Sequence, residues 1–188
     1  MKKYLILVKH SLPEVVENVP AREWRLSEEG QLRAERLAER MISYQPQVLI
    51  SSTEPKAKQT AEIVERKLQI PLHVAENLHE HDRSNFRYLS KERFEAAVCE
   101  FFAKPDLLVF GNEKANEAHT RFSSAVYSVL SRHENKTVVI VSHGTVISLF
   151  ASKLTGLPGF SLWKELGLPS FLVLDVQSNT LITCENIL

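Results

Sequence analysis

Cysteine is scarce in this chain of 188 residues, and Cys99 and Cys184 are the only two. They lie far apart and belong to no motif, so the sequence predicts reduced thiols and no disulfide framework. Such cysteine usage is typical of a reducing compartment, and we expect a cytoplasmic protein.

Long hydrophobic runs are also lacking. The chain begins with a basic stretch and an apolar run, Tyr4–Val8, of only five residues. This run is too short for the core of a signal peptide, and no segment is long enough to cross a membrane. We therefore expect Tyr4–Val8 to be a buried strand and predict no membrane partner.

Net charge is absent, because 23 lysines and arginines balance 23 aspartates and glutamates. The bulk electrostatics therefore favour neither nucleic acid nor an anionic membrane as a partner, and any bound anion must be held by local charge. Apolar residues make up 44% of the chain and charged residues 24%, as in an ordinary globular protein. The length fits a single domain spanning residues 1–188.

Short apolar runs alternate with amphipathic stretches along the chain. The runs Tyr4–Val8, Val48–Ile50 and Val138–Val141 are rich in Val, Leu and Ile, which is typical of strands buried on both faces. Pro55–Leu68 and Asn116–His133 are expected to be helical. This alternation predicts an α/β fold, a three-layer α-β-α sandwich around a mostly parallel sheet.

One helix should begin after Ser27, a good N-cap that is followed by two glutamates, and continue through Leu32, Leu37 and Met41. Phe171–Val176 and Leu181–Ile187 are expected to form a final hairpin, because the residues between them favour a turn. This hairpin would give the sheet an antiparallel edge strand.

Two segments offer little regular pattern. His79–Leu89 is polar and aromatic, and we expect a loop there. Leu157–Leu168, which includes Trp163, is also expected to be irregular. Trp24 and Trp163 are interpreted as packed side chains.

Basic and imidazole side chains follow three of the expected strands. Lys9 and His10 follow the first, Lys56 lies in the first turn of the helix after the second, and His143 follows the third. Ligands of open parallel sheets bind outside the carboxyl ends of the strands, where helix N-termini add positive charge. A single histidine after a strand is usually a packed residue, so the convergence of several basic groups is what predicts a phosphate site. Three other histidines lack this setting and are interpreted as structural or surface residues: His73, His119 and His133.

Four motifs in order resemble the histidine phosphatase superfamily, also called the phosphoglycerate mutase-like family. Lys9-His10-Ser11 stands where the family has Arg-His-Gly, and Ser142-His143-Gly144 matches its Ser-His-Gly. Leu78-His79-Glu80 matches a Leu-x-Glu that supplies a proton donor. Ser51–Ala61 reads SSTEPKAKQTA where the family pattern is SSPLxRAxQTA. Supporting matches are Leu26–Gly30 and the pair Glu113 and Arg121.

The resemblance implies a phosphoglycerate mutase-like fold and a histidine acid-type phosphatase that hydrolyses a small phosphorylated substrate. By resemblance, His10 is the nucleophile that forms a phosphohistidine, and Glu80 is the proton donor. Lys9, Lys56, His10 and His143 would bind the phosphate, with His143 also counted as catalytic. The lysines and a protonated His143 would lower the pKa of His10. No cofactor or metal is implied, since these groups supply the positive charge.

The neighbours of the predicted proton donor, His79, His81 and Asp82, are expected to tune it. Departures from the family pattern concern its arginines and a glycine. Lysine stands at positions 9 and 56, which keeps the charge but loses the planar fork that grips two oxygens. Serine replaces the glycine after the nucleophile, and Val15 and Val16 stand where the family has polar residues.

Three alternative functions stay open at this point, and so do the identity of the substrate and the oligomeric state. The first alternative, which the paired lysines fit, is a weakly active or non-catalytic phosphate-binding module on the same fold. A mutase-type phosphotransferase is the second, although the short chain and the modest lid expected in His79–Phe110 favour hydrolysis. Leaving-group contacts are expected from that segment and from Leu157–Leu168. The third is a metal-dependent hydrolase, with candidate ligands His10, His79, His81, His143 and Glu80.

Overall fold

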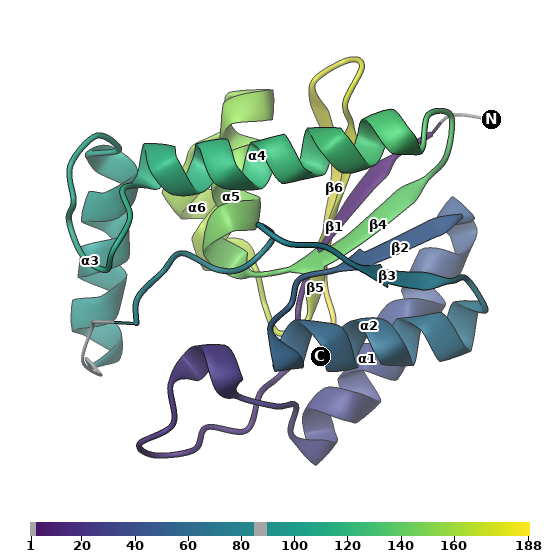
Figure 1. The fold of residues 1–188 in the computed structure, drawn as a ribbon, viewed down its shortest axis with the longest axis horizontal. Helices are drawn as coiled ribbons and strands as arrows, with labels where there is room; N and C mark the ends of the chain where they lie inside the picture. Colours follow the sequence, from purple (N-terminus) through teal and green to yellow (C-terminus); the bar gives the residue numbers. More distant parts are fainter. Residues whose placement is uncertain (1–2, 85–89) are drawn as a thin grey trace.

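A six-stranded sheet forms the centre of the protein in the computed structural model, which describes residues 3–84 and 90–188 (Figure 1). The strands are β1 (Leu5–Lys9), β2 (Val48–Ser51), β3 (Leu72–Val74), β4 (Val138–Ser142), β5 (Ser170–Asp175) and β6 (Thr180–Asn186). Their order across the sheet is β3-β2-β4-β1-β5-β6. The β2–β3, β2–β4 and β1–β4 pairs are parallel, whereas β1–β5 and β5–β6 are antiparallel. The predicted mostly parallel sheet with an antiparallel edge is confirmed.

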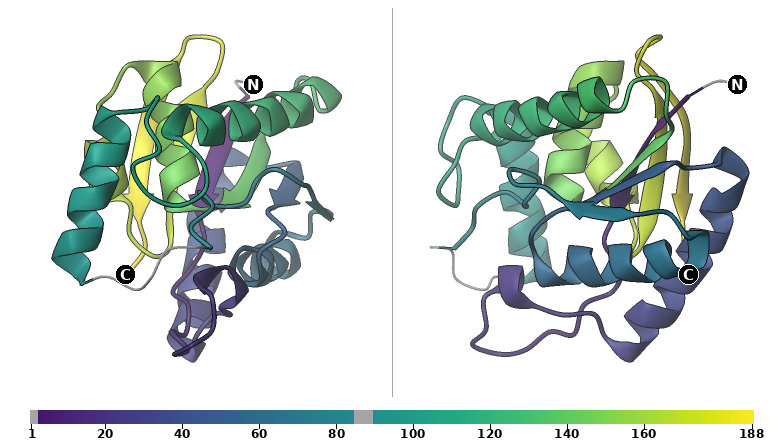
Figure 2. Two further views of the ribbon diagram at one scale, coloured as in Figure 1. Left: turned by 60° about the vertical axis from the view of Figure 1, so that its left-hand side comes forward. Right: turned by 45° about the vertical axis from the view of Figure 1, so that its right-hand side comes forward.

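Helices cover both faces of this sheet (Figures 1 and 2). The α-helices are α1 (Glu28–Met41), α2 (Pro55–Leu68), α3 (Lys91–Ala103), α4 (Ala115–Arg132), α5 (Gly144–Thr155) and α6 (Gly159–Glu165). Helices α1 and α2 pack on one face, and α4 and α5 on the other, with α3 and α6 alongside them. The predicted three-layer sandwich is therefore confirmed. Two short 3₁₀ helices, Ala21–Glu23 and Ile42–Tyr44, complete the regular structure.

The central strands are apolar on both faces because both faces are covered. In β1, Leu5 and Leu7 join the core beneath α4 and α5, while Ile6 and Val8 join the core beneath α1 and α2. All four are buried. Successive side chains of a strand point to opposite faces, so a strand between two helix layers reads as a continuous apolar run.

The start of α1 fixes the chain that leaves β1. Ser27 caps the helix as predicted, since its Oγ accepts a hydrogen bond of 3.0 Å from the N–H of Gly30. A Cβ on Gly30 would collide with the carbonyl oxygen of Leu12. Glycine is therefore required here for the loop after β1 to pack against the helix.

Two segments expected to be irregular each contain a helix. Helix α3 lies within His79–Phe110 and buries Val98 and Phe101, and α6 lies within Leu157–Leu168. Both expectations were wrong because these helices are held by tertiary packing, which their own sequences signal weakly. Strand β3, with its exposed His73, was also missed.

The described part of the expected loop His79–Leu89 is irregular, as predicted. Residues 79–84 contain no helix or strand, and residues 85–89 lie outside the described residues. Within the described part of the chain, none of the helices has the combination of length and hydropathy that a bilayer span requires.

Two leucines of α1 provide a test of the packing. Leu37 is fully buried against the sheet, whereas Leu32 is 52% exposed. We expect Leu37→Ala to lower the free energy of unfolding by about 2–5 kcal/mol, because it leaves a cavity. Leu32→Ala should change it by less than about 0.5 kcal/mol. Urea denaturation of both variants checks this, and equal losses would contradict the arrangement of α1.

Candidate active site

Two histidines meet at the carboxyl ends of neighbouring strands. Strands β1 and β4 pair in parallel with Lys9 opposite Ser142, so His10 and His143 leave the sheet side by side. Their ring centroids are 5.2 Å apart. The N–H of His10 also donates to the carbonyl of Ser142 at 3.0 Å. The structure thus brings together the two histidines that the sequence predicted to converge.

The ring of His10 has a defined orientation. Its Nδ1 lies 2.8 Å from the carbonyl oxygen of Ser11. A carbonyl only accepts hydrogen bonds, so Nδ1 carries the proton and Nε2 keeps its lone pair. Burial, reinforced by His143 and Lys56, holds the pKa of His10 well below its usual range. The imidazole is therefore neutral at physiological pH, as the sequence predicted.

His143 is neutral as well, contrary to the expectation that it would be protonated. It is fully buried, and that burial, followed by the charge of Lys56, holds its pKa well below the usual range. Its Nε2 lies 2.9 Å from the hydroxyl of Ser52 and 3.5 Å from Oε1 of Glu54. A neutral His143 offers hydrogen bonds at this site and no charge.

Lys56 reaches the site but is already paired. It is 5% exposed, and its Nζ donates to the carbonyl of Ala21 at 2.6 Å and to Oε2 of Glu54 at 2.7 Å. Sequence reasoning missed Glu54. Its position, two residues before the predicted phosphate-binding lysine and at a strand end, was the available signal.

Lys9 runs past the start of α5 toward Leu166. Its side chain passes Gly144, where an added Cβ would lie 3.1 Å from Lys9 Cε, and its Nζ donates to the carbonyl of Leu166 at 2.7 Å. Burial lowers the pKa of Lys9 to about 8, against the opposing effect of Glu80 and with a smaller contribution from Arg83. This lysine therefore loses its charge within reach of physiological pH.

Glu80 lies at the N-terminus of α5. Its carboxylate accepts hydrogen bonds from the N–H groups of Thr145 at 3.2 Å and Val146 at 3.3 Å, and from that of His81 at 2.9 Å. Burial alone would raise its pKa, but the charge of Arg83 and the N–H groups of His81 and Thr145 lower it to about 2. Glu80 is ionised in the resting site.

Arg121 holds the loop that carries Glu80. Its guanidinium donates to the carbonyls of Asn77, His79 and Glu80 at 3.0 to 3.2 Å, and it pairs with Glu113 at 2.6 Å. The two residues that supported the family resemblance, Glu113 and Arg121, thus position the predicted proton donor and lie behind it.

The expected tuning of Glu80 by its neighbours is only partly right. His81 contacts it through the backbone, while the His81 ring packs 4.3 Å from that of Phe101. Asp82 is turned to Ser84 and Asn112.

His79, in turn, is half-buried, and its carbonyl is bound by Arg121. The side chain that faces Glu80 is instead that of Arg83, whose Nη2 lies 3.6 Å from Oε2. Sequence reasoning missed it, because nothing local distinguishes this arginine from a solvated one.

Ser11 replaces the family's glycine without obstructing the site. Its hydroxyl donates to the carbonyl of Gly30 at 2.6 Å, and its N–H donates to Oγ1 of Thr60 at 3.0 Å. The serine is therefore turned toward α1 and α2. Val15 and Val16, a few residues further on, are both exposed.

The metal-dependent alternative requires several metal ligands that lie close together. Among residues 3–84 and 90–188, no three His, Cys, Asp or Glu side chains gather so that they could hold a metal ion.

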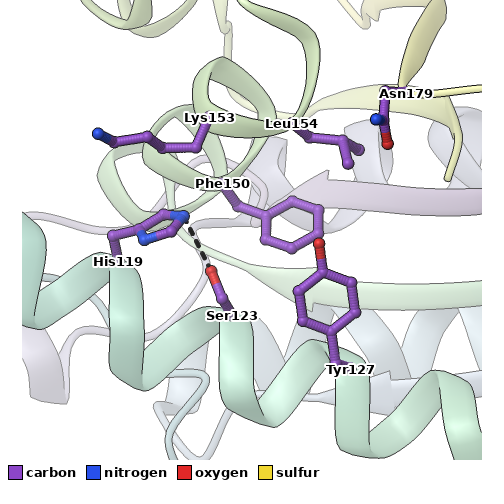
Figure 3. Close-up of a pocket in the computed structure, with 7 residues that line it drawn as sticks. All are labelled: His119, Ser123, Tyr127, Phe150, Lys153, Leu154 and Asn179. Atoms are coloured by element: carbon purple, nitrogen blue, oxygen red, sulfur yellow. Dashed lines mark hydrogen bonds between the residues drawn. The ribbon is translucent and has the colours of Figure 1, made fainter.

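A cavity of about 300 Å³ lies away from the two histidines, between α4, α5 and the β5–β6 turn (Figure 3). It contains none of the predicted site residues. Its lining is His119, Ser123, Tyr127, Phe150, Lys153, Leu154 and Asn179.

A family model and several solved structures of known proteins match this chain. The family model described as "Histidine phosphatase superfamily (branch 1)" matches residues 5–182. No curated protein sequence matches the chain. A mycobacterial glucosyl-3-phosphoglycerate phosphatase is similar in structure, with a TM-score of 0.75 and 21% identity over 92% of this chain and 90% of that chain.

A second similar structure is that of a phosphoserine phosphatase from Entamoeba histolytica in complex with 3-phosphoglyceric acid. Its TM-score is 0.79 and its identity 18%, and the match covers 98% of this chain and 97% of that chain. Together with the family match, this confirms the predicted phosphoglycerate mutase-like fold.

The lowered pKa of Lys9 gives a test of its contact with an anion. Above pH 8 the lysine loses its proton, whereas an arginine at this position stays charged. If Lys9 binds phosphate, the affinity for inorganic phosphate should fall about tenfold between pH 7 and pH 9. Lys9→Arg should remove most of this fall. Calorimetric titration of both proteins checks it, and parallel pH profiles would show that Lys9 does not contact the anion.

Proposed function

The chain belongs to the histidine phosphatase superfamily, and on that basis we propose that it hydrolyses small phosphomonoesters through a phosphohistidine on His10. Family membership supports the prediction that the protein is a phosphatase enzyme. The observation that carries the mechanism is the ring of His10, which is buried and neutral, with Nδ1 bound to the carbonyl of Ser11.

In the first step, the Nε2 lone pair attacks phosphorus and the bond to the leaving alkoxide oxygen breaks. The orientation of the His10 ring suits this step, because the Ser11 carbonyl stabilises the positive charge that develops as the N–P bond forms. His143 lies beside it and would hold a phosphoryl oxygen through a hydrogen bond.

Charge on the phosphoryl group would be stabilised from several sides. Lys9 and Lys56 carry the nearest ammonium groups, and the N-terminus of α5 adds a partial positive charge next to His143. Arg83 supplies a guanidinium close to Glu80. Preorganised positive charge of this kind is the main contribution of a protein to phosphoryl transfer.

Glu80 would move the protons in both steps. Because it is ionised at rest, it must gain a proton when substrate binds, either from a monoanionic ester or because the phosphate charge raises its pKa. It then protonates the leaving oxygen. In the second step the carboxylate takes a proton from the water that attacks phosphorus and releases His10.

A weakly active phosphate-binding module is the second candidate, and one observation favours it. Lys56, one of the two lysines that replace family arginines, already donates to Ala21 and Glu54. Restoring arginine at Lys9 and Lys56 discriminates between the two. A large gain of activity from near zero would support the module, whereas a modest change would support a working phosphatase.

Substrate class and location follow as parts of the same proposal. One structural neighbour is a phosphoserine phosphatase solved with 3-phosphoglyceric acid, and another acts, by its name, on glucosyl-3-phosphoglycerate. Small phosphorylated acids are therefore the first substrates to test. Both of these structural neighbours are phosphatases by name, which favours hydrolysis over mutase-type transfer, and a cytoplasmic location stays a prediction.

Phosphate release from a panel of phosphomonoesters, including phosphoserine and 3-phosphoglycerate, tests this function. Glu80→Gln should lower kcat on the order of 100- to 10,000-fold, because the proton donor is lost. His10→Asn should abolish turnover, and after acid-free quenching it should carry no phosphoryl label.

His133→Asn on the surface at the end of α4 serves as the control and should keep full activity. Absence of phosphate release from every ester, or labelling that survives His10→Asn, would overturn the proposal.

A further inference from the structure

The side chain of Glu54 lies between groups that are predicted to bind the phosphate. It lies in the turn between β2 and α2 and is only 10% exposed. Its Oε2 accepts a hydrogen bond from Lys56 Nζ at 2.7 Å, and its Oε1 lies 3.5 Å from Nε2 of His143. Oε1 also accepts the N–H of Glu80 at 2.9 Å. One carboxylate thus contacts both phosphate-binding groups that approach from this side.

A carboxylate and a phosphate seek the same donors. The ammonium group of Lys56 has three protons, and two of them already go to Glu54 and the Ala21 carbonyl. A phosphate that binds Lys56 must therefore share the lysine with Glu54 or displace it. In a buried site, two anions only a few ångströms apart repel each other strongly.

We infer that Glu54 is an internal competitor for phosphate, which weakens the binding of inorganic phosphate and thereby favours release of the product. The inference rests on the proposed function for the identity of the anion. It makes Glu54 a specificity-determining residue, because its cost is greatest for a ligand with two negative charges. The family pattern has leucine at this position, so the competitor belongs to this chain's own sequence.

A purely positioning role for Glu54 makes the opposite prediction. In that case the carboxylate would hold Lys56 and the loop of Glu80 in place for the ligand. Glu54→Leu, which removes both contacts, would then weaken phosphate binding, and Glu54→Gln, which keeps one acceptor oxygen in place of two, would weaken it less.

The experiment compares the two variants by calorimetric titration with inorganic phosphate and with orthovanadate. If Glu54 competes, both Glu54→Gln and Glu54→Leu should bind each anion about tenfold more tightly or better than the unaltered protein. The matched control is Glu39→Gln, which neutralises a carboxylate in a lysine pair of the same length, 2.7 Å, on the outside of α1 and α2. Its affinity for both anions should be unchanged.

Several results would overturn the inference. The first is unchanged or weaker anion binding in Glu54→Gln. The second is an equal gain of anion affinity in Glu39→Gln. The third is that neither the unaltered protein nor Glu54→Gln binds an anion. Glu54→Gln has nearly the same shape as the original residue, so it decides the question even if Glu54→Leu does not fold.

The measurement needs no turnover. A protein that hydrolyses no ester but gains phosphate affinity in Glu54→Gln would refute the proposed hydrolase and leave the competitor in place. Ester hydrolysis by the unaltered protein, without a gain of phosphate affinity in Glu54→Gln, would support the hydrolase and refute the competitor.

Discussion

The parallel pairing of β1 with β4 is the constraint on which the site depends. Its register sets Lys9 opposite Ser142, so that His10 and His143 leave adjacent strands at the same edge. A slip by one residue would turn every side chain of β1 to the other face. The register is secured because both faces of these strands are buried, by α4 and α5 on one side and by α1 and α2 on the other. The core thus holds the two imidazoles 5.2 Å apart.

Charge at this buried site is balanced more closely than the basic motifs suggest. Lys9, Lys56 and Arg83 supply three positive groups, and Glu54 and Glu80 supply two negative ones. Both histidines are neutral because burial disfavours their charged forms. The neutral form of His10 keeps the nucleophile's lone pair available. The balance of charge also means that an incoming phosphate meets carboxylates as well as cations.

The sequence predicts the sandwich and the members of the site that stand in local patterns. Apolar runs indicate the buried strands. His10 and His143 come just after two of these runs, and Lys56 lies in the first turn of the helix that follows a third. The only local signal for Glu54 is its place beside Lys56, because its role depends on contacts with His143 and with the loop of Glu80, both distant in sequence. Arg83 was missed for the same reason. Helices α3 and α6 depend on packing against the rest of the core, which the local sequence pattern does not record.

The most direct test of the account is a crystal structure of the protein soaked with orthovanadate. We expect vanadium bonded to Nε2 of His10, with its oxygens within 2.7–3.2 Å of His143 and Lys9 as charge-assisted or neutral hydrogen bonds require. One oxygen should face Glu80, on the side from which the leaving group departs. Vanadate bound at another place, or approached by Nδ1 of His10 after the ring has turned away from the Ser11 carbonyl, would contradict the central role assigned to this histidine.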